Sequence, residues 1–88
     1  MSVRIRLSEA YYEHTGDRET VEVEGATIKE CLDHLVAQFP VLRQLLFDSE
    51  YALGVIIIYR GDVITSDQLD RPVGDSDEIL LLPMIYGG

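Results

Sequence analysis

The residues with the clearest chemical potential are the last two of the sequence, Gly87 and Gly88. We expect the terminal carboxyl of Gly88 to be ionised at neutral pH, because its unperturbed pKa is about 3.3–3.7. A carboxylate is a poor electrophile, so it must be activated before a nucleophile can attack it. Glycine suits a tail that threads a narrow active site, because a missing Cβ frees the backbone dihedral angles and avoids collisions with the walls.

Three other groups of residues carry reactive side chains, and a structural interpretation is favoured for each. Cys31 falls on the apolar stripe of a predicted helix, so a core position is favoured over a role in sulfur relay. His14, in a predicted polar loop, and His34, on the polar face of the helix, have no suitably spaced second ligand, which predicts surface histidines. The acidic cluster within residues 75–78 precedes a strand, so an acidic turn is favoured over a cation site. We therefore predict no metal site in this chain.

Hydrophobic periodicity predicts the elements that must position the tail. Alternating apolar residues predict a strand over residues 3–7 and a hairpin partner over 19–25. Thr27 and Glu30 form a capping box before an amphipathic helix at 28–39, which Pro40 ends. The remaining predicted elements are a short helical turn at 41–47, a mostly β-branched strand at 53–59, a turn at Gly61–Asp62 into a short strand at 63–64, and a last strand at 79–82 that ends before Pro83.

This order of elements predicts an α+β fold, a mixed sheet with one main helix packed across it. The arrangement is that of a β-grasp, or ubiquitin-like, domain, although the order alone also permits other small α+β sheets. We expect one domain over residues 1–83, followed by a flexible Gly-Gly tail over 84–88. The chain has no internal repeat and no linker long enough to divide it.

The composition narrows the functional classes. The apolar fraction of 47% is typical of a globular protein, and the N-terminus shows neither a signal peptide nor a spanning segment. The formal charge of -9, with no basic cluster, argues against nucleic-acid binding, because phosphate affinity requires grouped Lys and Arg. We expect a cytoplasmic protein with no membrane partner, because Cys31 is the only cysteine and the N-terminus shows no targeting segment. Its acidic surface is consistent with a basic protein partner and equally with simple solubility.

The C-terminal sequence resembles the closing pattern of the MoaD/ThiS family of ubiquitin-like sulfur carriers. In that family an acidic turn leads into a strand, a proline and a terminal Gly-Gly. The first half of the chain is similar to the family as well, through the strands at 3–7 and 19–25 and the helix entered at Ala26–Thr27. The closing residues that carry the resemblance are Asp75, Asp77, Glu78, Ile79, Leu82, Pro83, Gly87 and Gly88.

The resemblance implies a function for the tail and a set of partners. An adenylating enzyme related to ubiquitin-activating enzymes would use ATP and magnesium to convert the Gly88 carboxylate into an acyl-adenylate. Sulfur would then attack this intermediate and leave a thiocarboxylate. The carrier would bind no cofactor itself, and it would act as a sulfur-donating small subunit of a synthase and not as a catalyst on its own.

The sheet predicts a docking surface for such partners. The strands at 53–59 and 79–82 are apolar on both faces, yet a single helix covers only one face of a small sheet. The second face should therefore contact a partner, unless loops or a second copy of the chain cover it. Our candidate contact residues are Ile56, Ile58, Leu80, Leu82, Pro83, Met84 and Tyr86.

Three classes of function remain open from the sequence. In the first, the Gly88 thiocarboxylate donates sulfur to a small molecule, which would be molybdopterin with the chain as the small subunit of its synthase, or the thiazole of thiamin. In the second, the tail is conjugated to proteins or donates sulfur for tRNA thiolation, as in ubiquitin-like modifiers. In the third, the chain is a β-grasp interaction module whose glycines are incidental. The chain length and the Pro83 ending favour the molybdopterin branch.

Overall fold

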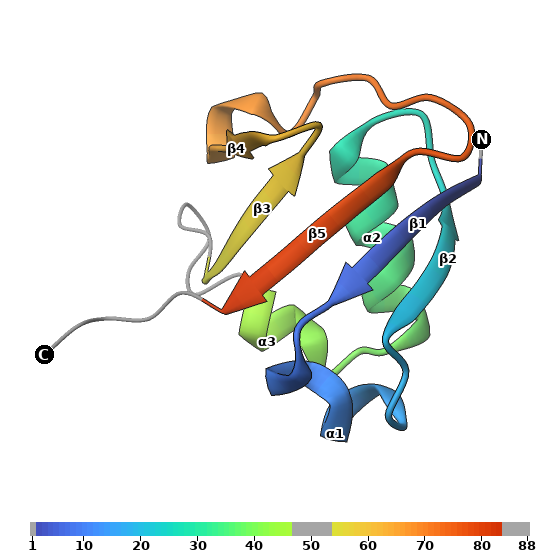
Figure 1. Cartoon of the computed structure of the whole chain (residues 1–88), viewed down its shortest axis with the longest axis vertical. Coiled ribbons are helices and arrows are strands. Elements are labelled where there is room, and N and C mark those ends of the chain that lie inside the picture. The colour runs from blue at the N-terminus through green and yellow to red at the C-terminus, as the bar shows by residue number, and fades with distance from the viewer. Residues whose placement is uncertain (1, 47–53, 84–88) are drawn as a thin grey trace, which may run out of the picture.

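The first hairpin and the last strand form one half of a mixed five-stranded sheet (Figure 1). The computed structural model describes residues 2–46 and 54–83. Strand β1, Ser2–Leu7, pairs antiparallel with β2, Thr20–Glu24, and parallel with β5, Glu78–Pro83. The full strand order is β2-β1-β5-β3-β4, so β5 is central although it is last in the chain.

A tight hairpin forms the other half of the sheet. Strand β3, Val55–Tyr59, pairs antiparallel with β4, Asp62–Ile64, and on its other side with β5. The two turn residues, Arg60 and Gly61, have φ angles of 53° and 82°. Positive φ at both positions is the geometry of a two-residue type I′ turn, which matches the twist of the flanking strands. The predicted return strand is confirmed, and the turn lies one residue earlier than the predicted Gly61–Asp62, because Asp62 already pairs with Tyr59.

The main helix, α2, runs from Ile28 to Gln38 across the sheet. At its N-terminus the Thr27 hydroxyl accepts a hydrogen bond from the Glu30 amide at 3.2 Å, as predicted. In a regular capping box the Glu30 carboxylate would accept from the amide of Thr27. Here it accepts instead from the amide of Ala26, the residue before the cap, at 2.9 Å. Phe39 caps the C-terminus in a non-helical conformation, which agrees with the predicted effect of the proline that follows.

Three short helical segments complete the described elements. Helix α3, Leu42–Leu46, confirms the predicted second helical turn, whose last residue lies outside the described range. The segment between β1 and β2 was expected to be a polar loop, but it contains the 3-10 turn η1, Glu9–Tyr11, and helix α1, Tyr12–Thr15. Buried Tyr11 and Thr15, four residues apart, anchor this segment to the core. A further 3-10 turn, η2, covers Ser66–Gln68.

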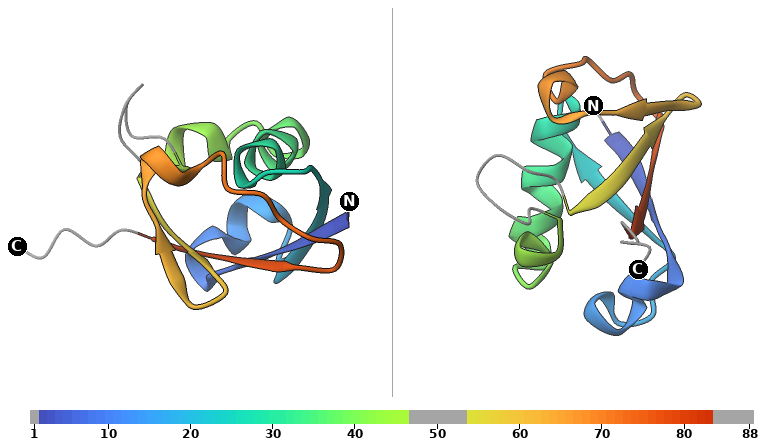
Figure 2. Two further views of the ribbon diagram at one scale, coloured as in Figure 1. Left: turned by 90° about the horizontal axis from the view of Figure 1, so that it is seen from above. Right: turned by 90° about the vertical axis from the view of Figure 1, so that its left-hand side faces the viewer.

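The core lies between the sheet and the helices α2 and α3, which are on the same side of it (Figure 2). Alternate residues of every strand point into this layer, and the helix contributes its apolar stripe. Among residues 2–46 and 54–83, no helix covers the opposite face of the sheet. The largest fully buried side chains are Ile5, Ile28, Leu32, Leu35, Leu42, Leu46, Ile57, Ile79 and Leu81.

Candidate functional site

The predicted reactive tail continues from the central strand of the sheet. Strand β5 ends at Pro83, which is in register with Val55 of β3. The strand thus extends one residue further than predicted, and proline is tolerated there because it is the terminal residue of the ladder. The tail residues singled out from the sequence, Met84, Tyr86, Gly87 and Gly88, lie outside the described residues.

The predicted contact residues of β3 and β5 gather on the face of the sheet that is turned away from α2. Ile56 is in register with Leu82, and Ile58 with Leu80, and all four side chains are half-buried. Their neighbours Val55, Ile57, Ile79 and Leu81 point into the core and are buried. The period of two along each strand places these two sets on opposite faces of the sheet.

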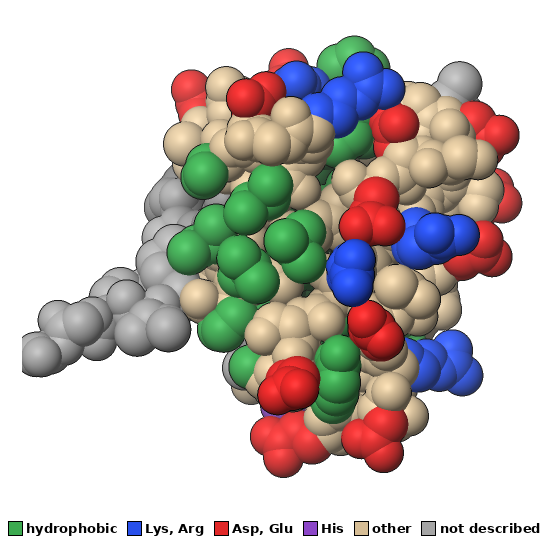
Figure 3. Space-filling model, viewed as in Figure 1, with side chains coloured by type: hydrophobic (Ala, Val, Ile, Leu, Met, Phe, Trp, Pro, Cys, Tyr) green, Lys and Arg blue, Asp and Glu red, His purple; other side chains and the backbone are tan. Residues whose placement is uncertain are grey.

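One further residue belongs to this surface. Val63 of β4 is in register with Ile58 and is 62% exposed, the largest exposure among the large apolar side chains of the described residues. Directly paired residues of antiparallel strands share a face, so Val63 extends the apolar surface to the edge of the sheet. We call Ile56, Ile58, Val63, Leu80 and Leu82 the open-face patch, and Figure 3 shows apolar side chains gathered in this region.

The rest of the same face is charged. Arg6 of β1 lies 3.3 Å from the Glu19 carboxylate and 3.9 Å from that of Glu78. All three side chains are about half exposed or more, so these ion pairs contribute little to stability. Their effect is to border the open-face patch with a polar rim, the arrangement that is typical of protein interfaces.

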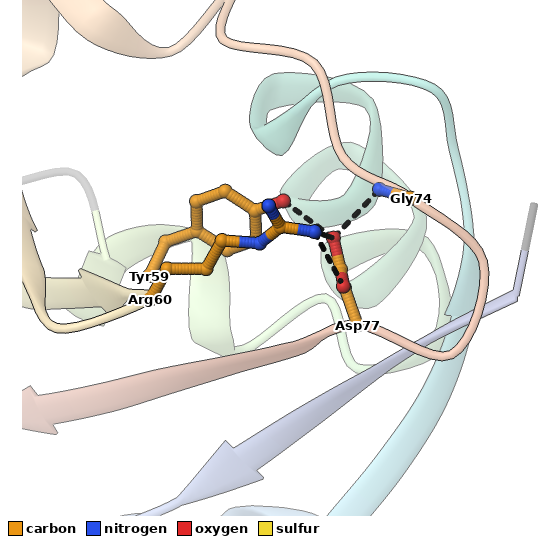
Figure 4. A network of polar contacts seen from close by, with 4 residues as sticks. All are labelled: Tyr59, Arg60, Gly74 and Asp77. Carbon is orange, nitrogen blue, oxygen red and sulfur yellow. Dashed lines mark hydrogen bonds and ion pairs between the residues drawn. The ribbon is translucent and has the colours of Figure 1, made fainter.

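A polar network fixes the turn that leads into β5 (Figure 4). The Asp77 carboxylate accepts hydrogen bonds from the hydroxyl of Tyr59, from the amide of Gly74 at 2.7 Å and from the Arg60 guanidinium at 3.2 and 3.3 Å. Arg60 and Arg71 also lie over the Tyr59 ring, at 5.4 and 5.1 Å from its centroid. The network joins the β3–β4 hairpin to the start of the central strand.

These contacts shift the protonation equilibria of both partners. The hydrogen bond from Tyr59, followed by that from the Gly74 amide, lowers the pKa of Asp77 below its usual value. The same bond to Asp77, together with burial, raises the pKa of the Tyr59 hydroxyl. Near neutral pH the network therefore holds an ionised Asp77 and a protonated Tyr59, the forms that the hydrogen bond requires.

The acidic cluster at residues 75–78 is used in structural contacts. Asp75 accepts a hydrogen bond from the Ser2 amide at 3.0 Å, Asp77 belongs to the network above, and Glu78 faces Arg6. These contacts confirm the predicted acidic turn. Within residues 2–46 and 54–83, no group of three or more His, Cys, Asp or Glu side chains is arranged to hold a metal ion.

The other reactive side chains also have structural roles. Cys31 is fully buried in the core, as predicted, and burial raises the pKa of its thiol. His14 lies in α1, not in a loop, with its Nε2 atom 3.4 Å from the Glu13 carboxylate. His34 lies at the surface, as predicted, and is half-buried there, and its Nδ1 atom accepts a hydrogen bond of 2.7 Å from the Glu24 amide. None of the helices in the described part of the chain is long and apolar enough to cross a membrane.

The strand order and the one long helix of the described residues define the class of this protein, a β-grasp, ubiquitin-like domain. The model of the ThiS family matches residues 5–88, nearly the whole chain and including the terminal Gly-Gly. The chain therefore belongs to the ThiS family, within the MoaD/ThiS ubiquitin-like sulfur carriers, and the resemblance found in its sequence is confirmed.

Solved structures show the same fold over the full length. The chain is similar to a chain of the BexX/CysO complex from Amycolatopsis orientalis, with 25% identity, coverage of 98% and 99% of the two chains and a TM-score of 0.83. It is 27% identical to small archaeal modifier protein 1 from Haloferax volcanii, with 100% coverage of both chains and a TM-score of 0.82. A chain of the complex of subunits 1 and 2 of molybdopterin-converting factor from Helicobacter pylori shares the fold, with 24% identity, 100% coverage of both chains and a TM-score of 0.63. The comparison with curated proteins gave no match.

Sequence reasoning missed two features around this site. The network of Tyr59 and Asp77 joins residues 18 positions apart, and no periodic pattern relates them. Val63 was assigned to a short strand, but its place on the patch depends on the hairpin register with Ile58. The run Asp62-Val63-Ile64 has no alternation of polar and apolar residues, so the sequence holds no signal for the face on which Val63 lies.

Proposed function

We propose that this chain is a sulfur carrier whose Gly88 carboxylate is the reactive group. The carboxylate attacks the α-phosphate of ATP on an adenylating enzyme, pyrophosphate leaves, and an acyl-adenylate forms. A sulfur nucleophile then displaces AMP, which leaves a thiocarboxylate at Gly88. The observation that carries this proposal is that the family match extends through the final glycine.

The folded body supplies recognition in this proposal. Ordering a tail of five residues costs about 1–2 kcal/mol per residue, so docking energy must come from elsewhere. The open-face patch is an apolar surface with a polar rim, and β5 leads directly from it to the tail at Pro83. The partner would contact this patch together with Pro83, Met84 and Tyr86, while Gly87 and Gly88 enter the active site.

For the sulfur acceptor we propose the precursor of molybdopterin, with this chain as the small subunit of the synthase and a large subunit as its partner. The fold shared with the Helicobacter pylori complex of molybdopterin-converting factor subunits supports this branch. The thiazole of thiamin is the alternative small-molecule acceptor.

A second candidate function is protein modification. The likeness to a small archaeal modifier protein, at 27% identity over both full chains, favours it. The same activated carboxyl would form an amide with a lysine amine in place of a bond to sulfur, or the thiocarboxylate would supply sulfur for tRNA. Both candidates need the same adenylation step. They differ in the nucleophile that attacks the acyl-adenylate, an amine or sulfur, or in the molecule that accepts the sulfur.

The test separates the shared step from the acceptor. The full chain is incubated with its adenylating enzyme, ATP, magnesium and a sulfur donor, and its intact mass is followed. Replacement of one oxygen by sulfur is expected, and an unchanged mass with an enzyme that adenylates other carriers would contradict the proposal. Sulfur-loaded chain is then offered to the large synthase subunit with precursor, or to a cell extract with a search for isopeptide-linked chain. Return of the carboxylate with precursor supports the first candidate, and isopeptide products support the second.

A further inference from the structure

Strand β2 is an edge of the sheet, and its outward backbone groups can be identified from its register. The Leu7 amide donates to the Glu19 carbonyl at 2.8 Å, so Leu7 and Glu19 form a hydrogen-bonded pair. Hydrogen-bonded and non-hydrogen-bonded pairs alternate along an antiparallel ladder. The backbone groups of Thr20, Glu22 and Glu24 therefore point away from β1, towards the free side of the sheet.

Two of these outward groups are bonded by side chains from the helix. The Glu24 amide donates to Nδ1 of His34 at 2.7 Å, and the Glu22 carbonyl accepts from Nε2 of Gln38 at 3.2 Å. His34 and Gln38 are one turn apart on α2, so they face the same stretch of β2.

An edge strand with unpaired backbone groups is a template for another strand. Every solution of this protein contains further copies of β2, so a second copy is the partner strand that is always available. Two antiparallel copies of one strand form a self-complementary, two-fold symmetric pair. The other edge, β4, has only three residues, which limits such pairing. Strand β2 has five residues. In an antiparallel pair centred on Val23, its exposed Glu22 would face Glu24 of the second copy, and Glu24 would face Glu22.

We propose that His34 and Gln38 form an edge guard, in which the two side chains occupy backbone groups of β2 and prevent a second copy of this chain from adding its β2 to the sheet. The glutamates act as a second barrier through like-charge repulsion. This proposal is independent of sulfur transfer, because it concerns the edge of the sheet that is farthest from β3 and β4.

The experiment removes the two barriers separately and together in the full chain. One variant carries His34→Ala and Gln38→Ala, a second carries Glu22→Gln and Glu24→Gln, and a third carries all four changes. Gln44→Ala, on the exposed side of α3, is the control for loss of a surface glutamine. Sedimentation equilibrium gives the dissociation constant for self-association, and circular dichroism checks that each variant is folded.

We expect the four-site variant to self-associate at least about tenfold more tightly than the Glu22→Gln/Glu24→Gln variant, because two backbone groups become available for pairing. The Glu24 amide should also exchange with solvent faster in the His34→Ala/Gln38→Ala variant than in the wild type. The proposal would be overturned if the four-site variant and the Glu22→Gln/Glu24→Gln variant self-associate equally, or if the exchange rate of the Glu24 amide is unchanged in the His34→Ala/Gln38→Ala variant. If the His34 change prevents folding, Gln38→Ala is added alone to the Glu22→Gln/Glu24→Gln variant. Self-association should then tighten by a smaller factor, and an unchanged dissociation constant would count against the edge guard.

Discussion

At the scale of single residues, Gly25 and Asp77 are each required at one junction between elements, Gly25 between β2 and α2 and Asp77 in the turn before β5. A Cβ atom at Gly25 would lie 2.8 Å from the Cys31 amide nitrogen and 2.9 Å from Cβ of Glu30. Glycine is therefore required at the β2–α2 junction for space. Asp77, in contrast, is needed for its side chain. Its carboxylate accepts hydrogen bonds from Tyr59 of β3, from the amide of Gly74 in its own turn and from Arg60 of the hairpin turn.

The crowding at Gly25 predicts a large cost for a small change. Gly25→Ala should lower the free energy of unfolding by about 1–3 kcal/mol, because the added methyl group must displace the first turn of α2. Urea denaturation measures the difference, and Ala26→Ser at the neighbouring exposed position should leave stability nearly unchanged. A Gly25→Ala variant as stable as the wild type would show that the junction can relax.

The lowered pKa of Asp77 predicts a specific dependence of stability on pH. Since the folded state favours the ionised carboxylate, its contribution is complete above the unfolded pKa of about 3.9 and is lost as the pH falls through the folded pKa. Asp77→Asn should therefore be destabilised at neutral pH, and its deficit relative to the wild type should shrink below about pH 4. Urea unfolding at several pH values tests this, with Tyr59→Phe expected to show a smaller deficit of the same form. A deficit that is constant with pH would contradict the assigned role of the carboxylate.

At the scale of the elements, the sequence predicts a helix or strand best where its apolar residues recur with a single period. The alternation of Val3, Ile5 and Leu7 and the helical spacing after Thr27 each predict their element to within about two residues, because burial on one face imposes the period. The segment of η1 and α1 was missed because only Tyr11 and Thr15 are buried there, and one pair is too short to show a period. The hydrogen bond from Glu24 to His34 was missed because it depends on how α2 lies beside β2.

The candidate site was predictable in composition but not in orientation. The sequence places too many apolar residues on β3 and β5 for one helix to cover. It does not say which alternating set is buried, and packing against α2 decides this in favour of Val55, Ile57, Ile79 and Leu81. The set that includes Ile58 therefore remains on the open face.

This orientation predicts the effect of a charge at the centre of the open-face patch. Ile58→Glu should weaken binding to the adenylating enzyme at least about tenfold, because a buried carboxylate without a partner opposes docking. The fold should persist, since the side chain points away from the core. Calorimetric titration measures binding, with Thr20→Glu on the same face but outside the patch as the control. Wild-type affinity for folded Ile58→Glu would remove the patch from the docking surface.

At the scale of the whole molecule, the topology places the last described strand, β5, at the centre of the sheet. Strand β5 is bonded on both sides, to β1 and β3, so the point at which the tail begins is held by the most enclosed strand. A tail that starts from a fixed point has a defined reach, which is at most about 3.3–3.6 Å per residue. In our proposal the position of the Gly88 carboxylate is therefore set by counting residues from Pro83.

The most direct test of the sulfur-carrier proposal changes that count by one residue. Deleting Gly88 withdraws the carboxylate by about 3.3–3.6 Å, far beyond the tolerance of about 0.5 Å for a positioned reaction, and one alanine added after Gly88 moves it too far. Both variants should fold and bind the adenylating enzyme as the wild type does, yet gain no sulfur when incubated with the enzyme, ATP, magnesium and a sulfur donor. Intact-mass measurement of the oxygen-to-sulfur exchange is the readout, with the wild-type chain in parallel. Sulfur loading of the Gly88 deletion at the wild-type rate would contradict the role of Gly88 as the positioned reactive residue. Failure of the wild-type chain itself to gain sulfur would contradict the sulfur-carrier proposal and favour an interaction module instead.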